Sequence, residues 1–314
     1  MRRIAAVLLF VTSCATIVSN EPLTLILGTA TPGGGFPLYG DALAKAIHES
    51  DPAITLVPRN TKGSGENIPL LEQGKLDLAL VAGEPAQEAL AGVGRPPSPI
   101  KAIAAMYPTA GMFVVRADSP YRTIQDLKGK PIAWGARASG FITQAGYVLD
   151  ALGLDRDRDF QAIYLDRVGD GPAMLREGRV AALWGGGLGF PSFIEAAKDA
   201  GGVRFLAPGE GEIQRIVAKH PSLKPVTVPA GSYPGQSQAI QSVGSWSFVF
   251  ARPDLPDESA YRVARALHRG EAKFATQLPQ ARESTAANTY AAVANPSLIH
   301  PGALKYLREA GVAR

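Results

Sequence analysis

Short apolar runs alternate with segments of helical periodicity from residue 23 to about residue 228, and this alternation constrains the fold more than any other feature. The apolar runs predict strands, and they read "LTLIL" (23–27), "ITLV" (54–57), "LDLALV" (76–81), "PIAW" (131–134), "VAALW" (180–184) and "VRFL" (203–206). Between them, residues such as Ala145, Val148 and Leu152 recur at the spacing of one helix face. Strands that alternate with helices are typical of parallel sheets with helices on both faces. The sequence therefore predicts an α/β fold.

Three pairs of similar segments indicate two similar lobes. The pairs are "LEQGKLDLAL" (71–80) with "LREGRVAALW" (175–184), "LILGTATPGGGF" (25–36) with "IAWGARASGF" (132–141), and "FVVRADSP" (113–120) with "FVFARPDLP" (248–256). One such pair alone would show only the helix, glycine and strand order that all parallel α/β proteins share. Three pairs in the same chain favour an internal duplication of the architecture.

The third pair suggests where the chain crosses between the lobes. If residues 113–117 and 245–252 are hinge strands, lobe 1 comprises 22–112 plus 253–314, and lobe 2 comprises 118–244. Two crossovers of this kind allow a protein to close around a ligand by hinge rotation. We therefore expect a two-lobed clamp with two crossover hinge strands.

The first 21 residues have the pattern of an export signal. Two arginines precede a short apolar segment, Ile4–Val11, which is too short to span a bilayer. The stretch "VTSC" (11–14) has the form of a bacterial lipobox, in which Cys14 would be acylated, while a cut after Ala15 fits the small residues almost as well. We expect export to the periplasm, and lipid anchoring at Cys14 is one of two alternatives.

Cysteine usage and charge narrow the class of protein further. Cys14 is the only cysteine, so the chain has no intramolecular disulfide. Of the 32 Lys and Arg residues two precede Cys14 and no Asp or Glu does, which leaves 30 basic against 28 acidic residues. Since no dense basic block is interleaved with aromatic residues, nucleic acid is not an expected partner.

Four glycine-containing turns lead from a predicted strand into a predicted helix. They are "GTATPGGGFPLYG" (28–40), "RNTKGSGENIPLLEQG" (59–74), "WGARASGF" (134–141) and "ALWGGGLGFPSFIEAA" (182–197). The first turn has Leu38 where a dinucleotide fingerprint needs glycine, and it lacks the Lys-Ser/Thr of a P-loop. Each turn nevertheless places unpaired N–H groups at the positive end of a helix. Because open α/β sheets bind ligands beyond the carboxyl ends of their strands, we expect the turns to line one cleft.

Several side chains in these turns are candidate ligand contacts. Ser64 and Ser139 stand at predicted helix starts, where a simple N-cap is the alternative role. Trp184 ends a predicted strand on the side of the expected cleft, and its alternative place is the core.

Three basic residues in the same turns bear on the charge of a ligand. For Arg59 and Lys62 the alternative role is a solvated surface charge, and for Lys62 that role is favoured. Arg137 lies inside a turn rather than on a helix face, which favours a ligand contact. Arginines at a binding site favour an anion.

No constellation of catalytic residues is evident. The sequence has no GxSxG, no HExxH and no cysteine after Cys14, and no pair of acids stands out. The dispersed histidines His48, His220, His268 and His300 are expected at the surface. We therefore expect a binding protein without catalytic residues, metal or cofactor rather than an enzyme.

The residues resemble a known family, the substrate-binding subunits of TRAP transporters of the TAXI type (TRAP-associated extracytoplasmic immunogenic proteins). The matching segments, in the family's order, are "GGGFPLYGDALAKAI" (33–47), "KGSGENIPLLEQGKLDLALV" (62–81), "IQDLKGKPIAWG" (124–135), "LGFPSFIEAA" (188–197), "PDLPDESAYRVARAL" (253–267) and "HPGALKYLREAG" (300–311). They cover most of the chain after the signal. "DLKGK" is common among binding proteins, whereas "HPGALKYLREAG" is much more specific.

The resemblance implies a monomeric, two-lobed periplasmic-binding-protein fold, type II-like, that delivers a small organic anion, commonly a carboxylate, to a sodium-coupled membrane permease. Its motifs carry over onto Gly34, Gly35, Ser64, Asn67, Ser139, Gly187 and Pro191 as ligand-binding residues. Phe36 stands where the family often has a tyrosine, and Tyr39 follows three residues on as a further candidate. The identity of the ligand is therefore not inherited. The alternatives are a receptor of an ABC importer, a sensory binding protein, or an enzyme on the same scaffold.

Overall fold

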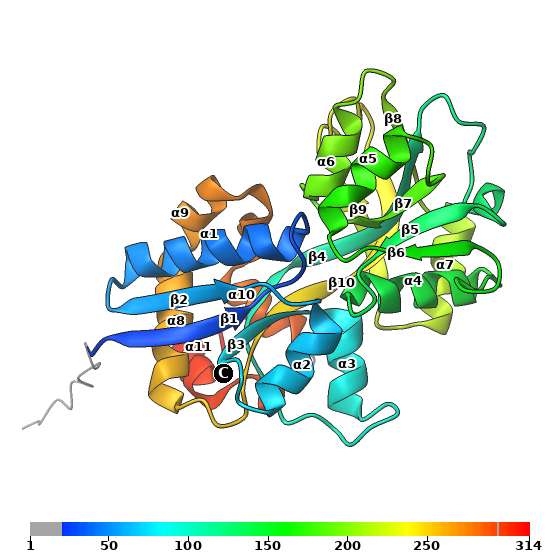
Figure 1. The fold of residues 1–314 in the computed structure, drawn as a ribbon. Coiled ribbons are helices and arrows are strands. Elements are labelled where there is room, and N and C mark those ends of the chain that lie inside the picture. The colour runs from blue at the N-terminus through cyan, green and yellow to red at the C-terminus, as the bar shows by residue number, and fades with distance from the viewer. Residues whose placement is uncertain (1–20, 294) are drawn as a thin grey trace, which may run out of the picture.

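The computed structural model describes residues 21–293 and 295–314, so Cys14 and residues 1–20 of the expected export signal lie outside it. Within the described residues, ten strands form a mixed sheet that runs through both lobes (Figure 1). The strands are β1 (Leu23–Gly28), β2 (Ile54–Arg59), β3 (Leu78–Ala82), β4 (Lys101–Arg116), β5 (Pro131–Gly135), β6 (Gln161–Tyr164), β7 (Ala182–Gly186), β8 (Val203–Leu206), β9 (Lys224–Val228) and β10 (Ile240–Ala251).

Helices cover the sheet in both lobes (Figure 1). The α-helices are α1 (Gly35–Ser50), α2 (Ser64–Glu72), α3 (Gly83–Ala91), α4 (Gly140–Ala151), α5 (Gly171–Arg176), α6 (Pro191–Ala197), α7 (Glu210–Lys219), α8 (Asp257–Arg269), α9 (Glu271–Gln277), α10 (Ala286–Ala292) and α11 (Pro301–Glu309). Short 3-10 turns are η1 (Gln125–Leu127), η2 (Val168–Asp170), η3 (Pro279–Glu283) and η4 (Pro296–Leu298).

The strand order is β2-β1-β3-β10-β4-β7-β5-β6, with β8 paired to β4 and β9 paired to β10. The triplets β2-β1-β3 and β6-β5-β7 are parallel, in agreement with the strand and helix alternation. The two long strands β4 and β10 are antiparallel to each other and to their other neighbours, and β8 is antiparallel to β4. Of the described strands that were expected in parallel sheets, only β8 pairs solely with an antiparallel neighbour, because alternation along the chain does not report strand direction.

Two separate regions of packed apolar side chains define the two lobes. One core draws on residues from Leu25 to Tyr107 and again from Val249 to Leu307. The other region, which contains two adjoining clusters, lies between Ala110 and Val243. Strands β4 and β10 contribute to both regions, so they are the segments that join the lobes (Figure 1). The lobe boundaries given above remain a prediction at the level of single residues.

The periodicity of α1 shows how the first lobe is assembled. Tyr39, Leu43 and Ile47 recur on one face of this helix and are each at most 1% exposed. Burying such a stripe against the sheet is the main source of stability for an amphipathic helix. The helix begins at Gly35, at the end of the glycine turn, so its packing also fixes the position of that turn.

Two histidines depart from the expected surface placement. His268 and His300 are buried, at 6% and 2% exposure. His300 accepts a hydrogen bond from the Gly302 N–H at the start of α11, and its other nitrogen lies 3.0 Å from the Leu255 carbonyl oxygen. Burial lowers the pKa of His300, which favours the neutral ring. His300 therefore connects the start of α11 with Leu255.

Candidate functional site

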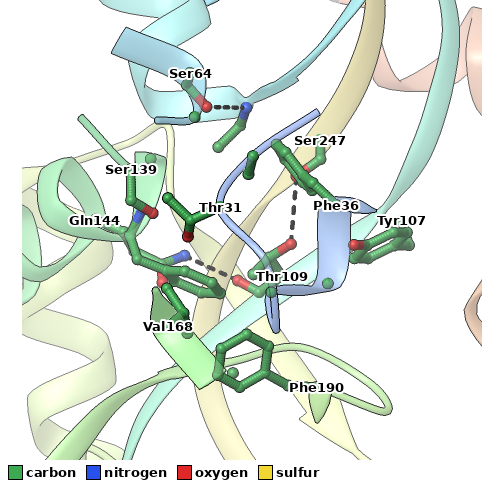
Figure 2. Close-up of a pocket in the computed structure, with 18 of the residues that line it drawn as sticks. Thr31, Phe36, Ser64, Tyr107, Thr109, Ser139, Gln144, Val168, Phe190 and Ser247 are labelled. Carbon is green, nitrogen blue, oxygen red and sulfur yellow. Dashed lines mark hydrogen bonds between the residues drawn. The ribbon is translucent and has the colours of Figure 1, made fainter. Parts of the chain in front are cut away.

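A pocket lies between the two lobes, where β4 and β10 pass from one to the other (Figure 2). It contains about 730 Å³ of empty space, part of it open to solvent. Lobe 1 and the joining strands contribute Ala30, Thr31, Gly34, Gly35, Phe36, Lys62, Gly63, Ser64, Ala82, Glu84, Tyr107, Thr109, Ser247 and Gln280. Lobe 2 contributes Ser139, Gly140, Phe141, Gln144, Val168, Gly186, Leu188 and Phe190.

The N-terminal ends of α1, α2, α3 and α4 meet at this pocket. The N–H groups of Gly35, Ser64 and Gly140, at the starts of α1, α2 and α4, donate no hydrogen bond to another described residue. Such groups carry the positive end of the helix dipole and bind anions readily. Because α1 and α2 belong to one lobe and α4 to the other, an anion held by all three would connect the lobes.

Hydroxyl and amide groups form the polar part of the wall (Figure 2). The Ser64 hydroxyl accepts a hydrogen bond from the Ala82 N–H at 3.0 Å, which leaves its own hydrogen free for another acceptor. The Ser139 hydroxyl caps α4 by accepting from the Phe141 N–H at 3.3 Å. The Thr109 and Ser247 hydroxyls lie 3.3 Å apart and connect β4 with β10. These groups can donate to a ligand as well as accept from it.

Two ionisable side chains of opposite sign line the pocket, Lys62 and Glu84. Lys62 is exposed and lies two residues before the start of α2. Glu84 is 1% exposed and lies in the first turn of α3. Burial raises the pKa of Glu84, and the nearby Glu88 acts in the same direction. Hydrogen bonds from its own N–H, from the Ser245 hydroxyl and from Gln144 oppose the rise.

Aromatic and aliphatic side chains supply the rest of the wall. Phe36 and Tyr107 come from lobe 1, and Phe141 and Phe190 come from lobe 2. The Phe141 and Phe190 rings meet edge to face with centroids 5.4 Å apart. This apolar surface suits the carbon skeleton of an organic ligand, as is usual for small-molecule pockets.

Of the residues predicted from sequence, Gly34, Gly35, Ser64 and Ser139 line the pocket together. They come from three of the four glycine turns, so the structure brings those turns to one place. The fourth turn, after β7, contributes Gly186 and Leu188 to the lining, whereas its predicted residues Gly187 and Pro191 do not.

Tyr39 and Asn67 lie beneath the pocket rather than in its wall. Tyr39 is fully buried, and its hydroxyl shares a 2.8 Å hydrogen bond with Ser284. Asn67 is also buried, and its amide donates to the carbonyl oxygens of Thr29 and Leu80 at 2.8 Å each. Asn67 therefore ties the end of β1 to β3 and supports the turn that precedes α1.

The two arginines lie outside the lining. Arg59 is exposed at the end of β2. Arg137 is exposed, and its guanidinium carbon lies 3.7 Å from the centre of the Tyr164 ring, a stacked cation–π contact. The structure thus gives Arg137 a packing partner in its own lobe.

The remaining predicted residues have structural roles in lobe 2. Trp184 lies within β7 at 3% exposure, and its indole N–H donates to the Phe141 carbonyl oxygen at 2.9 Å. Gly187 has a φ of 80°, which favours glycine, and its N–H donates to the Ala110 carbonyl oxygen. Pro191 is the first residue of α6, a position that suits proline.

Sequence reasoning missed several lining residues. Glu84 is an acid in the first turn of a helix, which is so common a position that it gives no functional signal. Gln144 lies one turn into α4, and Tyr107 and Thr109 lie on a joining strand. Their approach to the pocket depends on how the lobes fold together, and no local motif marks it.

Within 21–293 and 295–314, no group of three or more His, Cys, Asp or Glu side chains is placed to hold a metal ion. No helix in the same residues is both long and apolar enough to cross a bilayer.

Comparison with solved structures identifies the fold. MatC from Rhodopseudomonas palustris, solved with bound malate, matches with a TM-score of 0.60 at 14% identity over 91% of this chain and 97% of MatC. The periplasmic aliphatic sulphonate binding protein SsuA from Escherichia coli matches with a TM-score of 0.52 at 20% identity over 92% of this chain and 79% of SsuA. A putative L-cystine ABC transporter protein from Listeria monocytogenes matches with a TM-score of 0.51 at 14% identity, over 86% and 98% of the two chains. At these identities the likeness shows the fold alone, that of two-lobed periplasmic binding proteins.

Comparison with protein families extends over nearly the whole described chain. The sequence profile of the NMT1-like family matches residues 27–311. The matched range contains both lobes, β4, β10 and every residue that lines the pocket.

Proposed function

Because this chain belongs to the NMT1-like family and folds as periplasmic solute-binding proteins do, we propose that it captures a small organic anion between its lobes and delivers it to a membrane permease. The proposal that the ligand is an anion rests on one observation. The starts of α1, α2 and α4 bring N–H groups without acceptors to one pocket, and Lys62 lies beside them. A carboxylate fits this arrangement because it accepts several hydrogen bonds at once.

Lobe closure explains how the pocket holds such a ligand. The Gly65 N–H donates across the lobes to the Ala138 carbonyl oxygen at 2.9 Å. On the other side of the pocket, the Ser192 hydroxyl donates to the Gly33 carbonyl oxygen at 3.2 Å. The structure is therefore in a closed arrangement. A ligand that touches both lobes favours this arrangement over an open one, since it gains contacts only when the lobes meet.

Isothermal titration calorimetry with a panel of small carboxylates tests the proposal. A Cβ atom on Gly35 would lie 3.4 Å from the Tyr107 hydroxyl, so the Gly35→Leu side chain would fill the pocket. We expect at least one carboxylate to bind the wild type and its affinity to fall about tenfold or more in Gly35→Leu. Gly146→Leu is the matched control, since a Cβ at this helical glycine meets nothing within 4 Å. No binding by any carboxylate would contradict the proposal.

The partner permease is proposed to be of the TRAP type, on the resemblance of the glycine turns and of the C-terminal segment to TAXI receptors. An ABC importer is the second candidate, favoured by the likeness in fold to the putative L-cystine ABC transporter protein. Uptake of the bound carboxylate into cells that carry one or the other permease separates the two. A sodium gradient drives uptake in the first case, and ATP hydrolysis drives it in the second.

Delivery to either kind of permease requires that the protein is first exported to the periplasm. We propose that residues 1–21 direct the chain to the periplasm and that Cys14 or a residue just after it becomes the mature N-terminus. Mass spectrometry of the mature protein distinguishes an acylated Cys14 from a cut after Ala15. A mature protein that retains Arg2 and Arg3 would contradict export.

A further inference from the structure

The buried carboxyl of Glu84 is not explained by anion binding. It lines the pocket at 1% exposure, close to the groups that would hold a carboxylate. No ion pair in the described residues includes Glu84, and the charged group that acts on it most is another acid, Glu88. A buried acid without a cation is unusual, because the ionised form loses its hydration.

The side-chain oxygen of Gln144 is an acceptor without a donor among the described residues. Gln144 is 2% exposed and reaches the pocket from α4 in lobe 2. Its amide nitrogen donates to the Thr109 carbonyl oxygen at 2.9 Å (Figure 2). It also donates to Glu84 Oε1 at 3.1 Å, so both of its hydrogens are used. Since both partners are acceptors, the orientation of the amide is fixed. The Gln144 Oε1 atom is then buried without a hydrogen-bond partner among the described residues.

Within the described residues, the Glu84 carboxyl therefore lacks a positive partner and the Gln144 oxygen lacks a hydrogen-bond donor. A protonated primary amine provides both, because it carries three N–H groups and a positive charge. We propose that Glu84 and Gln144 form a subsite for the ammonium group of the ligand, which is accordingly an amino carboxylate. This inference rests on the proposed function, because the carboxylate of the same ligand takes the helix N-termini and Lys62. The aromatic wall then accommodates the remaining carbon skeleton.

A purely structural role for Glu84 predicts a different effect of the Glu84→Gln substitution. In that case the contact from Gln144 to Glu84 only holds lobe 2 against lobe 1. Glu84→Gln keeps an oxygen that accepts from Gln144, so such a role would survive the substitution. An ammonium subsite would not, since the amide carries no negative charge.

The test is calorimetry with α-amino acids that span aliphatic, aromatic and acidic side chains, each paired with its desamino carboxylate. We expect the amino form of at least one pair to bind the wild type about 10- to 100-fold more tightly than its partner, as a hydrogen-bonded charge would give. In Glu84→Gln that preference should shrink to within about threefold.

Glu88→Gln is the matched control. Glu88 lies one turn further along α3, outside the lining, and also contacts lobe 2 by accepting a 2.6 Å hydrogen bond from the Tyr147 hydroxyl. It should keep the wild-type preference, and circular dichroism should show all three proteins folded. Equal or tighter binding of the desamino forms, or an unchanged preference in Glu84→Gln, overturns the inference and leaves anion binding intact. If neither carboxylates nor amino acids bind, both proposals fail.

Discussion

At the scale of single residues, Lys62 is expected to contribute positive charge to the binding of a carboxylate. It is exposed at the pocket wall, two residues before α2, so its ammonium group can approach a bound carboxylate. We expect Lys62→Gln to raise the Kd of a carboxylate about three- to tenfold and to reduce the dependence of the Kd on salt. Lys75→Gln, at an exposed position outside the lining, is the control. A Kd that stays the same in Lys62→Gln at low and high salt would contradict this assignment.

The sequence and the structure predict different effects of Arg137 on anion binding. The sequence predicts that Arg137→Ala weakens anion binding sharply. Since the guanidinium stacks on Tyr164 outside the pocket lining, we instead expect the Kd to change by less than about twofold. Calorimetry with the same carboxylate decides between the two, and a large loss would place Arg137 in the site.

The protonation of Glu84 is expected to make the stability of the folded protein depend on pH. Its pKa is raised from the ordinary value of 4.5 in the folded state, so the folded protein holds this proton more tightly than the unfolded chain. The contribution of Glu84 to stability is therefore fully present below pH 4.5 and is lost as the pH rises toward the folded pKa. We expect Glu84→Gln to become progressively more stable than ligand-free wild type as the pH rises above 4.5. Urea unfolding across this range measures the difference, and a difference that is constant with pH would count against a raised pKa.

Single residues were predictable where local chain geometry decides their role. Gly35, Ser64 and Ser139 were found because a glycine or serine at a helix start exposes backbone N–H groups whatever the tertiary fold. Tyr39 and Trp184 were predicted to contact the ligand but are buried in the cores. Whether such a side chain points into a core or a cleft depends on the packing of other elements. For the same reason no local pattern identified Glu84.

At the scale of elements, the apolar runs located the strands of each parallel triplet well, with the exception of β6. That strand, "QAIY", has no fully buried residue, and β9, "KPVTV", is mostly exposed, so neither gives an apolar signal. The joining strands β4 and β10 extend far beyond the expected hinge segments, since each continues through both cores. Their antiparallel pairing follows from the route of the chain between lobes, which periodicity does not encode.

The start of α2 offers a test of closure at the scale of an element. A Cβ on Gly65 would lie 3.2 Å from the Ala138 carbonyl oxygen and 3.4 Å from the Ala138 Cβ of the facing lobe. Gly65 has no positive φ, so Gly65→Ala leaves the backbone of α2 unstrained and acts on the contact between lobes. We expect it to weaken carboxylate binding about three- to tenfold by hindering closure. Gly146→Ala, with open space at its Cβ, should bind as the wild type does; equal affinities in the two variants would exclude a role for this contact.

At the scale of the whole molecule, two cores joined by β4 and β10 predict a hinge motion. The contacts between the lobes include hydrogen bonds that water can replace, such as Gly65 with Ala138 and Ser192 with Gly33, so an open form should be accessible without ligand. We expect small-angle X-ray scattering to show a larger radius of gyration for the ligand-free protein than for the protein saturated with a carboxylate that binds. Identical scattering curves in the two states would argue for a permanently closed receptor.

The crystal structure of the protein with the carboxylate that binds most tightly tests the central claim most directly. The account predicts a ligand between the lobes, with its carboxylate in hydrogen-bond distance of the N–H groups of Gly35 and Ser64 in one lobe and Gly140 in the other. A ligand that contacts only one lobe, or that lies outside the pocket, would contradict it.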